Sequence, residues 1–405
     1  MLTPFSTQRQ SRIDTIQLAA LLLLMVASVA FVYSATMSNE SSVLLAWYRQ
    51  VWFRQIVFFG LGLGAASVVC LIDYHAISRW AYVAYWGAIL LLVAVLIPGI
   101  GSLRYGARRW IELGPFQFQP SEFAKLAFIL AQAHFLSRPV DELRQVGIFW
   151  RSIGLMVLPF LLVMKEPDLG SALVLVPTGL GMLYAAGTPK RYLLQLGTVV
   201  GIFAGLFVAD ILFAPPKWQI KMESYQRKRL LVYFGRNYAD FAQAGATVAD
   251  RRSLQEEQFK DSYNVKQALI AVGSGGLLGK GWRKGQQNAL GFLPQAGKHN
   301  DFIFSVIAEE KGFVGSVTVL TLYAVVLFSG IRIAGQARDR LGKLLAVGVV
   351  TLLFSHVFIN IGMNIRIMPV TGVPLPLLSY GGSSVLVSLI AMGLLQNVYI
   401  YRKAY

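Results

Sequence analysis

Long stretches of apolar residues, separated by short polar segments, are the dominant pattern along the chain. A helix needs about 20 mostly apolar residues to cross the hydrocarbon core of a bilayer. Helices of soluble proteins carry an apolar stripe on one face, whereas these stretches are apolar all round. The pattern predicts ten membrane-spanning helices, at residues 15–34, 53–72, 79–99, 122–137, 150–164, 170–187, 191–213, 302–332, 341–363 and 379–401.

The composition excludes a soluble domain of any size. Of the 405 residues, 55% are hydrophobic and 14% are charged, and the mean hydropathy is +0.55. Globular proteins have about 25% charged residues. We predict an all-α, polytopic integral membrane protein that forms one transmembrane domain over residues 1–405, with one large loop at 214–300. The lone Cys70 excludes an intramolecular disulfide, and we expect no nucleic acid partner.

Basic residues indicate the orientation of the spans, because lysine and arginine are enriched in short cytoplasmic loops. Arg9 and Arg12 precede the first span. Alternate loops and the tail are also basic, at Arg79, Arg138, Arg144, Arg151, Lys190, Arg191, Arg332, Arg338, Arg340, Lys343, Arg402 and Lys403. An even number of spans then places both termini in the cytoplasm and the 214–300 loop outside. The first span exceeds the apolar core of a signal peptide, about 7–15 residues, so we expect it to be retained.

The outer face is basic as well, which the orientation rule does not explain. Arg104, Arg108 and Arg109 lie in the short loop between the third and fourth spans, and the 214–300 loop is rich in lysine and arginine. These side chains can anchor the helix ends among lipid headgroups. Alternatively they form an anion site, since the planar arginine side chain suits phosphate oxygens. The net charge of +17 is compatible with both interpretations.

Polar motifs cluster at the expected outer ends of the spans. Glu122 and Lys125 share one helix face, as a structural ion pair or as part of a site. Asp168 follows a proline in a turn, where it either caps the next helix or faces a substrate. The glycine-rich stretch 265–315 is unsuited to a lipid-facing helix. It leads to Asp301, which either caps the eighth span or acts as a base at the membrane surface.

A fourth motif precedes the last span, where residues 360–384 combine several prolines and glycines. Such irregular backbone is typical of segments that line a cavity inside a membrane protein. By contrast, the glycine spacings at Gly60/Gly64 and Gly197/Gly201/Gly205 are explained by close helix packing. We assign no function to those glycines.

Taken together, these segments resemble the shape, elongation, division and sporulation (SEDS) family. The resemblance rests on five motifs that occur in the family's order, GARRWIELG…FQPSEFAK, EPDLGSALV, QALIAVGSGGLLGKG…Q, HNDFIFSVIAEEKGFVG and NIGM…PVTGVPLPLLSYGGSS. With the ten spans it covers nearly the whole chain. The last motif resembles the elongation branch of the family more than its division branch.

The resemblance implies a peptidoglycan glycosyltransferase that polymerises lipid II at the outer face of the bacterial cytoplasmic membrane during cell elongation and shape maintenance. Asp301 lies at the family's catalytic aspartate and is the expected base. The leaving pyrophosphate would be stabilised by cations, for which Arg109 and Lys125 are the first candidates. The residues expected to bind substrate are Arg108, Arg109, Gln119, Glu122, Lys125, Asp168, Lys280, Gln287, Ser379 and Ser383.

The chain departs from the family pattern just before Asp301. Gln295 replaces a glutamate that is usual in the family, about two residues are added at 296–298, and Asn300 replaces a threonine. The following Phe-Ile-Phe still fixes the register of Asp301. These departures put in doubt any role for the missing glutamate.

Two other functions fit parts of the sequence. Charged residues in spans and broken helices also suit a lipid II flippase, although the polar motifs gather at one face. A non-enzymatic scaffold of the cell-wall assembly complex would not need Asp301. The resemblance further implies a class B penicillin-binding transpeptidase as partner, and other membrane proteins of the elongation complex. A divalent cation, Mg²⁺ or Mn²⁺, would suit a pyrophosphate substrate, but no His or carboxylate cluster has clear ligand spacing.

Overall fold

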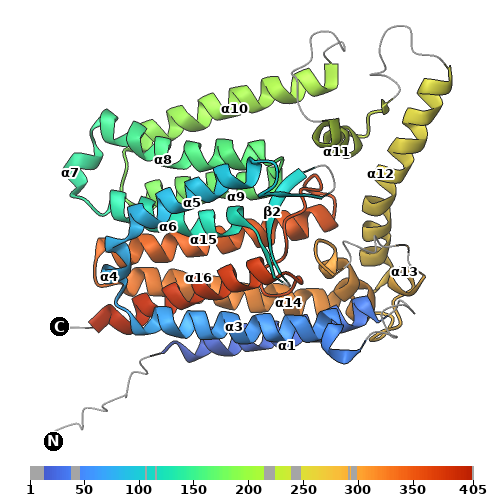
Figure 1. Cartoon of the computed structure of the whole chain (residues 1–405), viewed down its shortest axis with the longest axis horizontal. Helices are drawn as coiled ribbons and strands as arrows, with labels where there is room; N and C mark the ends of the chain where they lie inside the picture. The colour runs from blue at the N-terminus through green and yellow to red at the C-terminus, as the bar shows by residue number, and fades with distance from the viewer. Residues whose placement is uncertain are drawn as a thin grey trace, which may run out of the picture.

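Helices packed side by side form the body of the molecule (Figure 1), and the sequence predicted a helical protein. The computed structural model describes residues 13–37, 46–104, 107–114, 116–213, 224–238, 248–290, 292 and 299–403. Each of the ten predicted spans is a helix: α1 (Thr15–Thr36), α3 (Val51–Leu71), α5 (Ala81–Leu96), α6 (Pro120–Leu136), α8 (Val146–Lys165), α9 (Leu169–Ala185), α10 (Lys190–Phe213), α14 (Ile303–Gln336), α15 (Arg340–Asn364) and α16 (Gly382–Ile400).

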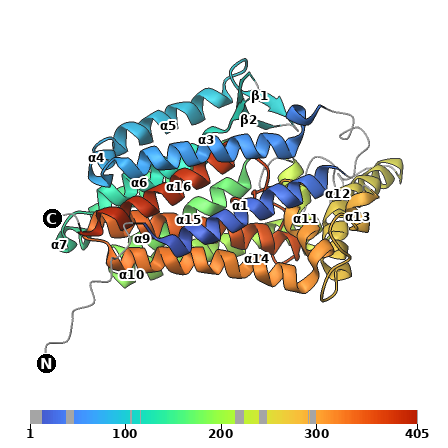
Figure 2. The same cartoon turned by 90° about the horizontal axis from the view of Figure 1, so that it is seen from below.

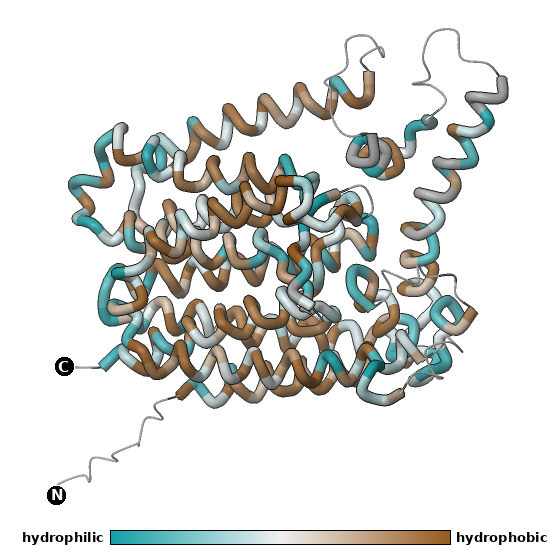
Figure 3. The backbone as a smooth tube through the Cα atoms, viewed as in Figure 1, coloured by the Kyte–Doolittle hydropathy of each residue, from teal (hydrophilic) through white to brown (hydrophobic). Residues whose placement is uncertain are grey.

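The prediction of a polytopic, mainly helical membrane protein is confirmed. In the part of the chain that is described, seven helices are long and apolar enough to cross a membrane, and α5 and α9 are shorter apolar helices. Hydrophobic residues follow the helices along most of their length, while hydrophilic residues gather mainly at their ends (Figure 3). Helix α1 begins and helix α16 ends at the same end of the bundle (Figure 1).

The centre of the bundle is formed by α15 and α16. Helix α15 packs against α6, α9, α14 and α16, and α16 packs closely on α3 (Figure 2). Most residues of α15 and α16 are buried. Helix α10 is mostly exposed, with Ile211 as its one buried residue. This helix lies at the edge of the bundle in Figure 1. A helix that buries so little against protein suits a lipid environment.

A small antiparallel sheet follows α5 and was not predicted. Its strands are β1 (Ser102–Arg104), β2 (Ala107–Leu113) and β3 (Phe116–Phe118), in the order β1-β2-β3. Ser102 pairs with Trp110 and Ile111 pairs with Phe118. The strands are too short to give an alternating pattern that stands out beside the long apolar stretches. The sheet lies at the opposite end of the bundle from the start of α1 (Figure 2).

The polar stretch that we expected to form a large loop is largely helical where it is described. It contains α11 (Ser224–Phe234), α12 (Val248–Ser274) and the short α13 (Gln286–Ala289). Four short helices complete the elements, η1 (Trp47–Arg49), α4 (Tyr74–Arg79), α7 (Val140–Leu143) and η3 (Tyr401–Lys403). Gln295 and residues 296–298, which depart from the family pattern, lie outside the described residues. The single-domain division of the chain stays a prediction.

Candidate active site

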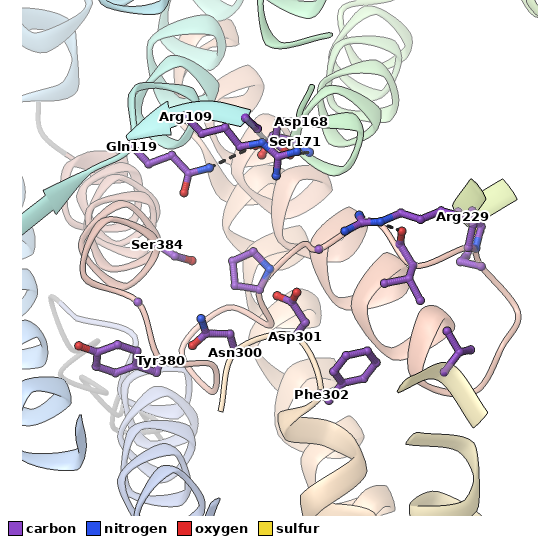
Figure 4. Close-up of a pocket in the computed structure, with 18 of the residues that line it drawn as sticks. Arg109, Gln119, Asp168, Ser171, Arg229, Asn300, Asp301, Phe302, Tyr380 and Ser384 are labelled. Atoms are coloured by element: carbon purple, nitrogen blue, oxygen red, sulfur yellow. Dashed lines mark hydrogen bonds between the residues drawn. The ribbon is translucent and has the colours of Figure 1, made fainter. Parts of the chain in front are cut away.

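A cavity of about 1030 Å³ opens at the end of the bundle that carries the β-sheet. Its walls come from β2, the starts of α3 and α9, helices α11 and α12, and the irregular segments around residues 300, 370 and 382. The side chains from these elements converge on it (Figure 4). Five basic residues line the cavity against two acidic ones, namely Arg54, Arg109, Arg229, Lys266 and Arg366 against Asp168 and Asp301. A cavity with this excess of positive charge attracts an anionic ligand.

Asp301 lies at the floor of the cavity, in the turn directly before α14 (Figure 4). Its backbone carbonyl accepts hydrogen bonds from the Nδ2 atoms of Asn360 and Asn364, both at 3.0 Å. These two asparagines are four residues apart on α15 and therefore share a helix face. Within the described part of the chain, no hydrogen bond restrains the Asp301 carboxylate itself.

Burial dominates the electrostatics of Asp301 and raises the pKa of its carboxyl to about 6. The charge of Asp168 raises this pKa further, while Arg229 and Arg109 lower it. A carboxylate is a better base when its pKa lies near the working pH. Asp301 is thus mostly ionised at pH 7 and is a stronger proton acceptor than an exposed aspartate.

Arg109 joins the β-sheet to the α8–α9 turn. Its Nε donates to the carbonyl oxygen of Glu166 at 3.1 Å, and one Nη donates to that of Pro167. The φ angle of Pro167 is +30°, far from the value near −65° that the ring prefers. Arg109 lines the cavity, as do Ala107 and Trp110 of the same strand, whereas its neighbour Arg108 does not.

Asp168 serves as a helix cap and also lines the cavity, so the cap is confirmed and its contact with a substrate stays a prediction. Its Oδ1 accepts from the backbone N–H of Ser171 at 3.2 Å at the start of α9. Its Oδ2 accepts from Gln119 Nε2 at 3.2 Å and from Ser121 Oγ at 3.4 Å. Gln119 in turn donates its backbone N–H to Ser383 Oγ at 3.1 Å. The structure therefore connects Gln119, Asp168 and Ser383 in one wall of the cavity.

Ser379 stabilises the turn before Asp301 and does not line the cavity. Its hydroxyl donates to the carbonyl oxygen of Asn300 and accepts from the N–H of Leu375 at 2.8 Å. The side chain is buried. It holds the backbone on which Asn300 and Asp301 are placed.

Besides Arg108 and Ser379, four more of the residues expected to bind substrate do not line the cavity. Lys125 and Glu122 are 1% and 2% exposed and form a buried pair inside the bundle, with Nζ 2.6 Å from Oε1. The same Nζ lies 2.8 Å from His356 Nε2 on α15. Lys280 Nζ and the Gln287 backbone N–H both bind the buried Glu309, at 2.8 and 2.9 Å. The cavity geometry gives these four side chains no support as substrate ligands.

Several cavity residues were not singled out from the sequence. Arg229 on α11 donates from Nη1 to the carbonyl oxygen of Val370 at 3.2 Å, and the Tyr233 hydroxyl donates to that of Ile367 at 2.7 Å. They bring α11 against the segment that follows α15. The basic run at Arg227–Arg229 was the available signal, but a charge run is usually a solvated face. Only the tertiary contacts identify Arg229 as a cavity residue.

Comparison with known proteins decides the family. The chain matches the FtsW, RodA and SpoVE family, described as cell cycle proteins, over residues 14–404. The chain belongs to this family. It is 36% identical over 393 residues to the peptidoglycan glycosyltransferase MrdB of Escherichia coli, covering 96% of this chain and 94% of that protein. It is 35% identical over 406 residues to stage V sporulation protein E of Bacillus subtilis, covering 98% and 100%. The predicted resemblance, including its RodA-like character, is confirmed.

Solved structures agree along the whole length of the chain. The rod shape determining protein RodA of Thermus thermophilus superposes with a TM-score of 0.66 at 28% identity, covering 98% of this chain and 100% of that one. A chain from a study of how a peptidoglycan synthase complex coordinates polymerization and crosslinking superposes with a TM-score of 0.73 at 29% identity. That match covers 97% of this chain and 99% of the other. The overall helical fold is therefore that of the family.

Proposed function

We propose that the chain is a peptidoglycan glycosyltransferase that polymerises lipid II. Membership of a family whose relatives carry this activity gives the reaction class. One observation carries the assignment to this cavity: Asp301, with a carboxyl pKa raised by burial to about 6, faces a space whose charged residues are mainly arginine and lysine. A base beside fixed cations suits a reaction that deprotonates a hydroxyl and expels a pyrophosphate.

In the proposed reaction the 4-hydroxyl of an acceptor N-acetylglucosamine attacks the anomeric carbon of a donor N-acetylmuramic acid. The hydroxyl proton passes to Asp301 as the new carbon–oxygen bond forms. The bond to undecaprenyl pyrophosphate breaks, and its electron pair leaves with the pyrophosphate. A single displacement inverts the anomeric centre, so no covalent sugar–enzyme intermediate is needed. Arg109 and Arg229, on two sides of Asp301 in Figure 4, are placed to stabilise the developing negative charge.

Purified protein and labelled lipid II test this function directly. We expect glycan strands from the unaltered protein and a loss of at least about a hundredfold in rate from Asp301→Asn, the size of effect expected of a general base. The variant should keep the thermal unfolding temperature of the original in the same detergent. If the Asp301→Asn variant polymerises lipid II at a rate within a few-fold of the original, Asp301 is not the base. Transport of lipid II across vesicles without polymerisation would favour the flippase instead.

The orientation and location of the protein are part of the same proposal. We place it in the bacterial cytoplasmic membrane with both termini in the cytoplasm and the cavity at the outer face, where lipid II is polymerised. The basic residues at the end where α1 begins support this orientation. Cysteines introduced singly beside the cavity, in a Cys70→Ala background, should react with a membrane-impermeant thiol reagent in intact spheroplasts. Cysteines near the end of α16 should react only after lysis.

A transpeptidase of the class B penicillin-binding type is the proposed partner. The similar chain comes from a complex that coordinates polymerization with crosslinking, and glycan strands need a second enzyme to join their peptides. Tagged protein from native membranes should co-purify such an enzyme under mild detergent. Repeated recovery without one after crosslinking would contradict the partnership. Other membrane proteins of the elongation complex are further partners that the same purification tests.

A divalent cation, Mg²⁺ or Mn²⁺, is the remaining proposal for this site. Among the described residues no group of three or more His, Cys, Asp or Glu side chains could hold a metal ion. Mg²⁺ is usually bound through one or two carboxylates together with substrate phosphates. Both carboxylate oxygens of Asp168 already accept hydrogen bonds and Asp301 is the proposed base, so the substrate phosphates would supply most of the ligands. Chelation should lower turnover, and added Mg²⁺ should restore it; unchanged turnover would remove the cation from the proposal.

A further inference from the structure

Helix α14 is broken at Gly312, two residues after its buried N-terminal stretch ends at Glu310, and another part of the chain fills the break. Gly312 has φ +63° and ψ −155°, so the helix does not continue through it. The carbonyl oxygens of Glu309 and Glu310 accept instead from the backbone N–H groups of Lys280 and Gly281, both at 3.0 Å. On the far side of the break, the N–H of Phe313 donates to Gly276 at 2.8 Å. The break therefore leaves these backbone groups paired, as buried groups must be.

This insertion depends on glycines because the two backbones touch. A Cβ atom on Gly275 would lie 2.0 Å from the carbonyl oxygen of Ala308, and one on Gly279 would lie 2.2 Å from that of Glu310. Both distances are far below any real Cβ contact. The segment 275–287, which we call the brace, is thus fitted against the part of α14 before the break, residues 303–311, which we call the half-helix.

One ion pair joins the brace to this half-helix. Glu309 is fully buried, and its Oε1 accepts from Lys280 Nζ at 2.8 Å and from the Gln287 N–H at 2.9 Å. Its Oε2 has no hydrogen-bond partner among the described residues. A buried carboxylate without its counter-ion is strongly destabilising. Lys280 is the cation that offsets this cost.

The other end of the same half-helix is the Asp301 turn. Residues 302–310 are buried throughout, and Ser305 Oγ donates to Asn364 Oδ1 at 2.6 Å. Asn364 also holds the Asp301 carbonyl. A helix rises 1.5 Å per residue, so Glu309 lies roughly 12 Å from Asp301 along the axis. That is too far for the pair to touch the same reacting atoms.

We infer that Lys280 and Glu309 are positioning residues for Asp301: their ion pair locks the brace onto the half-helix that places the catalytic carboxylate. This inference rests on the proposed function, because it concerns the same reaction. It replaces the expectation that Lys280 and Gln287 bind substrate. The pair acts through the half-helix and lines no part of the cavity.

A double-mutant cycle on lipid II polymerisation distinguishes positioning from substrate binding. We expect Lys280→Met and Glu309→Gln each to lower kcat at least tenfold with little change in KM for lipid II. The double variant should be no slower than Lys280→Met, because it also removes the unpaired buried charge. If Lys280 instead binds a substrate phosphate, Lys280→Met raises KM. It then lowers kcat/KM by the same factor in the Glu309→Gln background as in the original protein.

The pH dependence of kcat/KM distinguishes positioning of Asp301 from a purely structural role of the ion pair, because only the first changes the acid limb. When the brace fails, Asp301 becomes more exposed to water, the effect of burial on its pKa weakens, and the acid limb of kcat/KM moves to lower pH. Lys280→Arg keeps the ion pair and should stay within a few-fold of the original. Lys284→Met is the matched control, since Lys284 is an exposed lysine of the same segment and should leave rate and pH profile unchanged.

Two outcomes would overturn the inference. One is that the losses in kcat from Lys280→Met and Glu309→Gln add up in the double variant. The other is that the acid limb of kcat/KM stays at the same pH in both single variants. If Lys280→Met does not fold, Glu309→Gln is compared with the double variant, and equal turnover supports positioning. Polymerisation by the unaltered protein separates a failure here from a failure of the proposed function.

Discussion

Asp301 and Arg229 face each other across Gly372. A Cβ atom on Gly372 would lie 3.6 Å from Asp301 Oδ2 and 3.8 Å from Arg229 Nη1. Gly372 has φ +76°, a conformation that side chains with a Cβ rarely adopt. The charge of Arg229 reaches Asp301 past this glycine and lowers the pKa of the carboxyl against the effect of burial.

Removing Arg229 should therefore move the pH dependence of the reaction. Without this cation the pKa of Asp301 rises above about 6, and the base is ionised only at higher pH. We expect Arg229→Gln to shift the acid limb of kcat/KM toward higher pH, measured as initial rates between pH 5 and pH 8, roughly the range in which such a base titrates.

Arg54 provides the matched control for this shift. It lines the same cavity, but its charge is not among the causes of the Asp301 pKa. Arg54→Gln should leave the acid limb in place whatever it does to the rate. An acid limb that moves equally in both variants would show a general effect of cavity charge rather than a specific effect of Arg229.

Arg109 should matter for turnover more than for substrate affinity. Its guanidinium binds the two carbonyl oxygens of the Glu166–Pro167 turn and faces the cavity. Charge on the leaving pyrophosphate grows toward the transition state, so a cation there lowers the barrier. We expect Arg109→Ala to lower kcat per folded molecule by roughly a hundredfold, the scale of losing one electrostatic donor, and Arg109→Lys to lower it less.

The neighbouring Arg108 separates this role from headgroup anchoring. Arg108 is on the same strand but does not line the cavity. If the loop only anchors helix ends, Arg108→Ala and Arg109→Ala should both lower the yield of folded protein and leave turnover unchanged. A turnover loss confined to Arg109→Ala would exclude simple anchoring.

The helices and Asp301 could be predicted from the sequence because their signals are local. Each span is a continuous apolar stretch, and Asp301 lies in a motif with a fixed register. The cavity walls could not be predicted, because they depend on contacts between distant segments. Arg229 lies in the cavity wall because α11 contacts the segment after α15, where Arg229 donates to Val370. Lys125 lies away from the cavity because α6 packs against α15 and pairs this lysine with Glu122 and His356.

Glu166 should be uncharged at pH 7, which no feature of the sequence indicated. The side chain is fully buried, and neither carboxylate oxygen has a hydrogen-bond partner among the described residues. Burial raises its pKa to about 9, with the charge of Asp168 adding to the effect and Arg109 opposing it. In the unfolded chain the carboxyl ionises near its ordinary pKa of 4.5. Stability must therefore fall as the pH rises from about 4.5 to about 9.

We expect Glu166→Gln, which keeps the shape and removes the ionisation, to unfold at a higher temperature than the original at pH 7. The advantage should grow with pH up to about 9, because the original loses stability over this interval and the variant does not. Thermal unfolding in one detergent at several pH values measures it. Lower stability of Glu166→Gln at every pH would mean that the ionised carboxylate is the native form.

His75 forms a second pH-dependent contact, at the end of the bundle away from the cavity. Its Nδ1 lies 2.8 Å from Asp73 Oδ1 and its Nε2 lies 2.7 Å from Asp339 Oδ2. Asp339 also accepts from the Tyr74 hydroxyl at 2.8 Å and caps α15 through Gly342. Both ring nitrogens face carboxylates, so the doubly protonated imidazolium fits the contacts best. The cluster joins the α3–α4 turn to the start of α15.

Burial lowers the pKa of His75, but the hydrogen bonds and charges of Asp73 and Asp339 outweigh it and raise the pKa above the ordinary 6.5. A histidine with a raised pKa contributes stability that is fully present below 6.5 and is lost as the pH rises through the folded value. We expect His75→Gln to be less stable than the original at pH 6 and to approach it in alkaline solution. His134, which is not part of the cluster, gives the control variant His134→Gln. A stability difference for His75→Gln that does not depend on pH would show that the contact is made by the neutral ring.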